Sequence, residues 1–135
     1  MVTGVRRAEL LALRWSDIDL KAGKIAIHRN YVGLRAVCMK GRQDARMRLI
    51  SLDPATVEVL TQHRQRYAEA VPELGLEPSD EAFLFSYEAA WDRPYDPSGA
   101  THRYARMCKR LGIGSHLHAL RHYSATELLT AGVDL

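Results

Sequence analysis

The sequence predicts one α+β domain that is mainly helical and carries a small three-stranded antiparallel sheet. Stretches rich in Ala, Glu, Leu and Arg favour helices, and between them lie short segments rich in Ile and Val, one of which alternates apolar and polar residues. A length of 135 residues suits one domain, and 47% hydrophobic with 26% charged residues is typical of a globular chain.

The first 52 residues are expected to form one helix and the sheet. The segment RRAELLALR, residues 6–14, favours a helix with Leu10 and Leu13 on one face. The three strands are predicted at KIAIHRNYV (24–32), LRAVCM (34–39) and MRLISL (47–52), with a hairpin connection at 41–44 between the last two.

The remainder is expected to be helical apart from one long loop. A helix should begin after Asp53, because an aspartate cap followed by proline is a strong start signal. Residues 72–96 predict a surface loop with a brief extended piece at AFLFS. A basic helix is predicted at 99–112 and a last helix at 118–131, each closed by a glycine.

Several protein classes are disfavoured by composition. No apolar run approaches the ~20 residues that span a bilayer, and the start, MVTGVRRAELL, has no apolar signal core, so we expect a cytoplasmic protein with no membrane partner. Cys38 and Cys108 lie far apart and in no CxxC pair, which favours reduced thiols.

Charge is distributed unevenly along the chain. Residues 1–50 hold 11 Lys/Arg against 4 Asp/Glu, residues 51–100 hold 3 against 10, and residues 101–135 hold 5 against 2. Two basic ends around an acidic middle suggest a polyanion-facing surface made by both ends, although such clusters are also typical of solvated faces.

The segment SHLHALRHYSAT, residues 115–126, holds the densest set of candidate functional side chains. His118, Arg121 and His122 are spaced i, i+3 and i+4, so they share a helix face. His116, His118 and His122 have the residue type for a metal site, but an arginine lies among them and no cysteine or carboxylate is close in sequence. Buried structural histidines are another interpretation.

A phosphate site is the third interpretation of this segment, and the residues favour it. A helix N-terminus offers free N–H groups. Arg121 adds a planar fork for two phosphate oxygens, and His118 adds a group that titrates near neutral pH. Arg6 and the basic hairpin are candidates for further cations.

Together these motifs resemble the catalytic domain of the tyrosine recombinases, the phage integrase family. TGVRRAELLALRWSDIDL resembles the family's first arginine box, and HALRH resembles its second, with AGVDL following at the expected distance. The basic hairpin and ISLDP between the boxes resemble the family's strand-turn-strand, so the resemblance covers essentially the whole chain in order.

The resemblance implies site-specific DNA recombination or integration. In the family a tyrosine attacks the scissile phosphate and forms a 3′-phosphotyrosyl link, without metal or nucleotide cofactor. By their motif positions Arg6 and Arg121 would clamp the phosphate and His118 would assist proton transfer, with His122 supporting and Glu9 and Asp17 anchoring the first box. The DNA-binding residues would be Arg7, Arg42, Arg46 and Arg48.

The family's hairpin lysine has two candidate positions in this sequence. Counting back from LDP places Arg42 there, whereas Lys40, two residues earlier, is the only lysine available. Because an arginine is a poor proton donor, Lys40 is the preferred candidate.

The resemblance further implies a partial catalytic domain, residues 1–135. The N-terminal core-binding domain and the segment with the nucleophilic tyrosine are expected to lie outside this chain, and Tyr123 and His116 are expected to be incidental. Expected partners are double-stranded DNA and other recombinase subunits, on a bacterial or phage nucleoid. Three hypotheses stay open: a strand transferase (or its topoisomerase-like variant), a catalytically silent DNA-binding integrase remnant, and a small metalloprotein.

Overall fold

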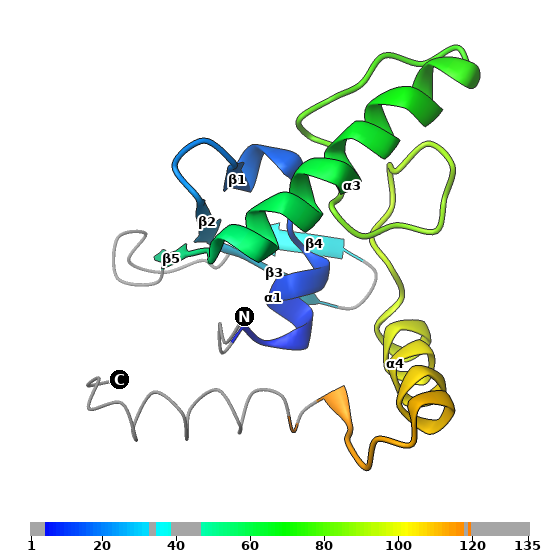
Figure 1. Cartoon of the computed structure of the whole chain (residues 1–135). Helices are drawn as coiled ribbons and strands as arrows, with labels where there is room; N and C mark the ends of the chain where they lie inside the picture. The colour runs from blue at the N-terminus through cyan, green and yellow to red at the C-terminus, as the bar shows by residue number, and fades with distance from the viewer. Residues whose placement is uncertain (1–4, 33–34, 39–46, 118, 120–135) are drawn as a thin grey trace.

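The computed structural model describes residues 5–32, 35–38, 47–117 and 119 of the chain (Figure 1). Its elements in chain order are α1 (Arg7–Leu11), the 3₁₀ turn η1 (Trp15–Asp17), β1 (Ile18–Asp19), β2 (Lys24–Ile27), β3 (Arg29–Val32), β4 (Arg35–Cys38), β5 (Arg48–Ser51), α3 (Pro54–Glu73) and α4 (Pro97–Leu111). Figure 1 shows α3 running past the strands and α4 set apart at the end of a long connection.

The predicted three-stranded antiparallel sheet is present, and β2 is its central strand. Ile25 of β2 pairs with Ile18 of β1 on one side and with Ile50 of β5 on the other. A second, two-stranded ladder joins β3 to β4, with Arg29 opposite Cys38.

The membership of the sheet differs from the prediction. The strand expected at 24–32 is divided at His28 into β2 and β3, and the described part of the segment expected at 34–39, which is β4, pairs with β3 in the second ladder. The third strand is instead β1, which has two residues and is too short for alternation to reveal.

The first helix is shorter than the predicted 6–14. It ends at Leu11 because the following residues pair with residues 82–84: Leu13 O accepts from Leu84 N at 2.9 Å, and Trp15 N donates to Ala82 O at 3.1 Å. Arg14 and Phe83 form an antiparallel bridge, so the extended piece expected at AFLFS is confirmed. Tertiary pairing here outweighs the helix propensity of the sequence.

Both long helices begin with the same signal, an aspartate cap followed by proline. Asp53 Oδ1 accepts from Thr56 N at 2.9 Å, as expected. Asp96 Oδ2 accepts from Gly99 N at 2.6 Å, so α4 begins at Pro97 and the predicted start at residue 99 was two residues late. Gly112 ends α4 with φ of 67°, the left-handed conformation that favours glycine. The last predicted helix, 118–131, falls almost entirely outside the described residues.

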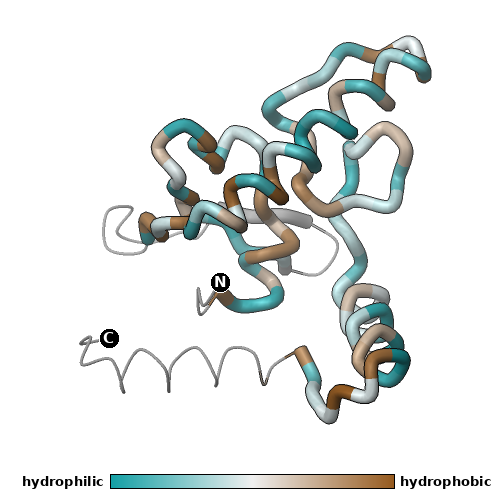
Figure 2. The backbone as a smooth tube through the Cα atoms, viewed as in Figure 1, coloured by the Kyte–Doolittle hydropathy of each residue, from teal (hydrophilic) through white to brown (hydrophobic). Residues whose placement is uncertain are grey.

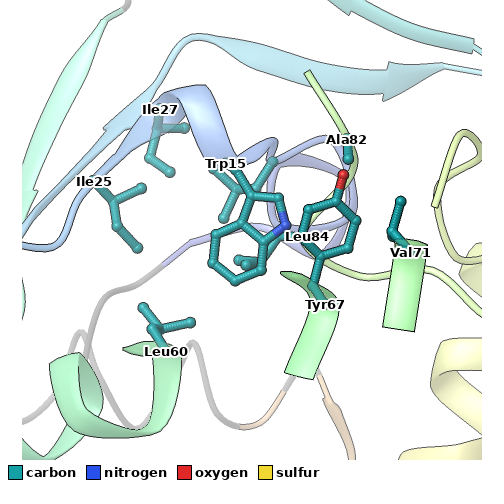
Figure 3. Close-up of a cluster of buried hydrophobic side chains, with 9 residues drawn as sticks. Trp15, Ile25, Ile27, Leu60, Tyr67, Val71, Ala82 and Leu84 are labelled. Carbon is teal, nitrogen blue, oxygen red and sulfur yellow. The ribbon is translucent and has the colours of Figure 1, made fainter. Parts of the chain in front are cut away.

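The hydrophobic core lies between α3, β2 and residues 82–84 (Figure 3). The ring of Trp15 stacks on Tyr67 with centroids 6.0 Å apart, and Ile27 and Leu84 are almost fully buried. The Tyr67 hydroxyl accepts from Ser79 N at 2.8 Å and reaches Ser79 O at 3.2 Å. The core therefore fixes the segment that follows α1 against α3 and residues 82–84.

The helices are amphipathic rather than apolar throughout. Figure 2 shows hydrophilic and hydrophobic residues alternating along α3 and α4. Across the described part of the chain, no helix combines the length and the hydropathy needed to cross a membrane.

Candidate DNA-phosphate site

Arg6 lies immediately before α1, in extended backbone with φ of −71° and ψ of 148°. Its backbone N–H donates to Glu9 Oε2 at 2.9 Å, and its side-chain Nη1 lies 3.4 Å from Glu9 Oε1. The carboxylate three residues along thus satisfies an N–H at the start of the helix, as in one half of a capping box. Because the Arg6 side chain is 60% exposed, its guanidinium is accessible to a ligand.

Glu9 is the buried centre of this cluster, with its side chain 2% exposed. A buried carboxylate is tolerated only when it is paired and hydrogen-bonded. Arg48 Nη2, at the start of β5, supplies the second cation and donates to Glu9 Oε2 at 2.6 Å. One carboxylate therefore holds two arginines that come from different elements.

The electrostatic balance of this cluster favours an anion. Two guanidiniums share one carboxylate, which leaves one uncompensated positive charge, and the Arg48 side chain is 45% exposed. Guanidinium groups match the geometry of phosphate oxygens and stay charged at any physiological pH. The cluster is therefore chemically suited to the oxygens of a phosphate group.

A second cluster repeats this arrangement around Asp17. Arg14 N donates to Asp17 Oδ2 at 2.9 Å, and the Asp17 side chain is 2% exposed. Its other oxygen is ion-paired with Arg29 of β3 and lies 3.3 Å from His28 Nε2. Both carboxylates thus join the first box to the strands, a geometry that is compatible with the anchoring role expected of Glu9 and Asp17.

Arg7 lies on the side of α1 that meets α4. Its Nη1 donates to Thr101 Oγ1 at 2.7 Å. A cleft of about 800 Å³ opens between these helices and is lined by aliphatic and aromatic side chains and by four arginines, namely Arg7, Arg103, Arg106 and Arg110. The basic helix expected at 99–112 therefore contributes its positive charge beside the first box.

The structure brings together Arg6, Glu9 and Arg48 and places Arg7 in the neighbouring cleft. The other predicted site residues lie outside the described residues, and their placement stays a prediction: Lys40, Arg42, Arg46, His118, Arg121 and His122. The choice between Lys40 and Arg42 stays open for the same reason.

The metal hypothesis also stays a prediction. Among the residues that the structure describes, no three His, Cys, Asp or Glu side chains are grouped as metal ligands. His116 is described, but its proposed partners His118 and His122 are not.

Arg29 and His28 were not predicted from the sequence as partners of Asp17. A signal was present, because Arg14-x-x-Asp17 repeats the spacing of Arg6-x-x-Glu9. That repeat indicates a second helix-start carboxylate, but which strand residue pairs with it depends on tertiary structure.

Fold and site together define an α+β domain in which the buried carboxylate of Glu9 holds two exposed arginines, Arg6 and Arg48. The model of the phage integrase family matches residues 1–135, and the chain therefore belongs to this family.

Relatives and solved structures agree with this assignment. A XerC-like tyrosine recombinase of Caldanaerobacter subterraneus subsp. tengcongensis is 26% identical, with 98% of this chain and 37% of that protein covered. The ICEBs1 integrase of Bacillus subtilis (strain 168) is also 26% identical, and the match covers 98% of this chain and 36% of that protein. This chain thus spans less than two fifths of the length of these two relatives.

Two solved structures share the fold. The XerA recombinase superposes with a TM-score of 0.69 at 25% identity, covering 98% of this chain and 42% of that one. The Tn1549 transposon integrase, solved in complex with a circular intermediate DNA, superposes with a TM-score of 0.74 at 19% identity. The match covers 98% of this chain and 44% of that one.

Proposed function

We propose that this chain supplies part of the site at which a tyrosine recombinase binds, cleaves and rejoins DNA strands. The observation that carries the proposal is the exposed guanidinium of Arg6, held beside Arg48 on the buried carboxylate of Glu9. Membership of the phage integrase family and the overlap with tyrosine recombinases support it.

The proposed reaction exchanges one phosphate ester for another. A tyrosine hydroxyl attacks the scissile phosphorus and loses its proton to a base. The bond from phosphorus to the 5′-oxygen breaks, and that oxygen takes up a proton. The 3′-phosphotyrosyl link conserves the phosphodiester, so rejoining needs no nucleotide cofactor. The tyrosine is expected to come from outside these 135 residues.

This chain's residues would stabilise the charge that grows on the non-bridging oxygens. Preorganised cations are most effective there when water is excluded. Arg6 and Arg121 would clamp the phosphate, and His118 would donate a hydrogen bond to it. Lys40, or Arg42 in its place, would face the leaving oxygen. Arg7 and Arg46 would contact the DNA backbone, and Arg48 would lie on the same DNA-facing surface.

Double-stranded DNA is the proposed partner, together with other recombinase subunits. The integrase of Tn1549 was solved in complex with DNA and shares this fold. The four arginines that line the cleft between α1 and α4 add a second source of positive charge. A cytoplasmic site of action, on a bacterial or phage nucleoid, follows from this proposal.

The proposal is tested by fluorescence anisotropy of a labelled DNA duplex across a salt series. We expect Arg6→Ala to weaken binding by about tenfold, the loss of one charge-assisted hydrogen bond. It should also reduce the slope of log affinity against log salt by roughly 0.9.

The matched control is Arg66→Ala, which removes one positive charge from the exposed surface of α3. Equal effects of Arg6→Ala and Arg66→Ala would contradict the proposal, as would binding that is insensitive to salt. The gene sequence beyond Leu135 separates the two DNA-binding hypotheses, since a tyrosine there favours the strand transferase over the silent remnant.

A further inference from the structure

We propose that Arg48 is a positioning residue for Arg6 and acts on it through the carboxylate of Glu9. This inference rests on the proposed function, because the position of Arg6 matters for DNA only if Arg6 binds phosphate. The exposure of Arg48 alone would suggest that it contacts the DNA backbone independently of Arg6. A positioning role differs from this, because Arg48 would act through Arg6.

One oxygen of Glu9 is shared by the two arginines. Glu9 Oε2 accepts from both the Arg6 backbone N–H, at 2.9 Å, and Arg48 Nη2, at 2.6 Å. Glutamate has a flexible side chain whose ordering costs conformational entropy. Two donors on one oxygen restrict the carboxylate, and the restricted carboxylate in turn holds the main chain of Arg6 and lies 3.4 Å from its Nη1.

Arg48 is itself held by the sheet. It is paired in register with Ile27 of β2, whose side chain is completely buried in the core. The guanidinium of Arg48 therefore starts from a backbone position that the core determines. A continuous set of contacts leads from the core through β5 and Glu9 to Arg6.

The helix that Arg6 precedes, α1, has only five residues. A helix of this length is not stable alone and takes its position from tertiary contacts. The Glu9–Arg48 ion pair is a contact of that kind, made close to the point where Arg6 enters the helix. Loss of Arg48 should therefore loosen Arg6 although Arg6 is chemically unchanged.

Positioning and simple electrostatics predict opposite signs for one substitution. Glu9→Gln removes a negative charge beside the DNA-facing arginines, so electrostatics alone predicts tighter binding. Positioning predicts weaker binding, because a neutral amide holds the two guanidiniums less strongly than a carboxylate does. The matched control is Glu73→Gln, an exposed carboxylate at the end of α3.

The experiment measures the DNA affinity of this chain by fluorescence anisotropy for Glu9→Gln, Arg48→Met, Arg6→Ala and the double variant Arg6→Ala/Arg48→Met. Circular dichroism and thermal unfolding establish that each variant is folded. We expect Glu9→Gln and Arg48→Met each to weaken binding several-fold. Arg48→Met should have little further effect once Arg6 is alanine, as a double-mutant cycle detects. Arg48→Met retains the apolar stem of a half-exposed residue, so it keeps the test valid if Glu9→Gln does not fold.

Two results would overturn the inference while leaving the proposed function intact. One is binding by folded Glu9→Gln that equals or exceeds that of wild type and Glu73→Gln. The other is additive losses for Arg6→Ala and Arg48→Met, which would make Arg48 an independent contact. If Arg6→Ala itself binds DNA like wild type, the proposed function fails, and the inference fails with it.

Discussion

Glu9 in α1 and Arg48 at the start of β5 are joined by a 2.6 Å hydrogen bond, although 39 residues separate them in sequence. Asp17, at the end of η1, and Arg29, at the start of β3, form a corresponding pair that is 12 residues apart in sequence. The first box is therefore attached to the strands at two points, each of them a buried carboxylate. Stability and DNA binding should both depend on these attachments.

Asp17→Ala should lower the free energy of unfolding by about 3–5 kcal/mol, because it removes a buried carboxylate and leaves both Arg29 and the Arg14 N–H without their partner. Urea denaturation monitored by tryptophan fluorescence measures this change. The control is Asp80→Ala, whose side chain is 73% exposed although it pairs with Arg64. That loss should stay below about 1 kcal/mol, and equal losses would show that burial of Asp17 is not what matters.

Tyr67→Phe should lower the free energy of unfolding by about 1–3 kcal/mol. The hydroxyl is the partner of Ser79 N at 2.8 Å, and its removal leaves that N–H unpaired. Tyr87→Phe is the matched control, because Tyr87 is 61% exposed, and it should change stability by less than about 0.5 kcal/mol. A Tyr67→Phe variant as stable as wild type would mean that water replaces the hydroxyl.

Gly112→Ala should destabilise the end of α4 by about 1–2 kcal/mol, the cost of placing a Cβ in left-handed backbone. Nothing lies within 4 Å of the position that a Cβ would take there, so the cost comes from the backbone alone. Gly114→Ala tests this, since Gly114 has equal space and no positive φ. Thermal unfolding should separate the two variants, and identical midpoints would contradict this backbone effect.

The cap of α3 should make stability depend on pH in the acid range below 3.8. The hydroxyl and the backbone N–H of Thr56 donate to Asp53 and lower the pKa of its carboxyl below the ordinary value of 3.8. A lowered pKa gives stability that is complete above 3.8 and is lost as pH falls through the folded-state value.

Asp53→Ala should therefore be less stable than wild type at neutral pH, and the difference in urea midpoint should shrink as pH falls below 3.8. Asp53→Asn retains a cap without a titrating group, so its stability relative to Asp53→Ala should not change with pH in this way. A difference between wild type and Asp53→Ala that is constant down to the lowest pH would contradict the role of ionisation.

Local signals predicted the elements that depend on local residues. Asp53 with Pro54 predicted the start of α3, and Gly112 predicted the end of α4, because caps act within a few residues. Alternation predicted a strand over β2 and β3, and the short segment MRLISL predicted the strand at β5. The exit of the chain from α1 was missed, because it depends on pairing between Arg14 and Phe83, which no local pattern contains.

In the candidate site too, the sequence predicted the residues but not all of their tertiary contacts. The motifs predicted Arg6 and Arg48 as DNA-facing residues and Glu9 as an anchor of the first box, and the structure places the three in contact. The sequence did not predict that Glu9 would be the shared acceptor, or that Arg29 and His28 would meet Asp17. Those pairings join residues of different elements, so they depend on tertiary structure and not on a local pattern.

The pairing of residues 13–15 with residues 82–84 has a consequence for how fast the domain folds. The whole sheet and α3 lie between these two segments in sequence, so a large chain loop must close before the pairing forms. Contacts of high sequence separation slow folding because the entropy of closure is lost before the contacts form. Formation of α3 should therefore precede burial of Trp15, and the rise in tryptophan burial should trail the helical signal during refolding.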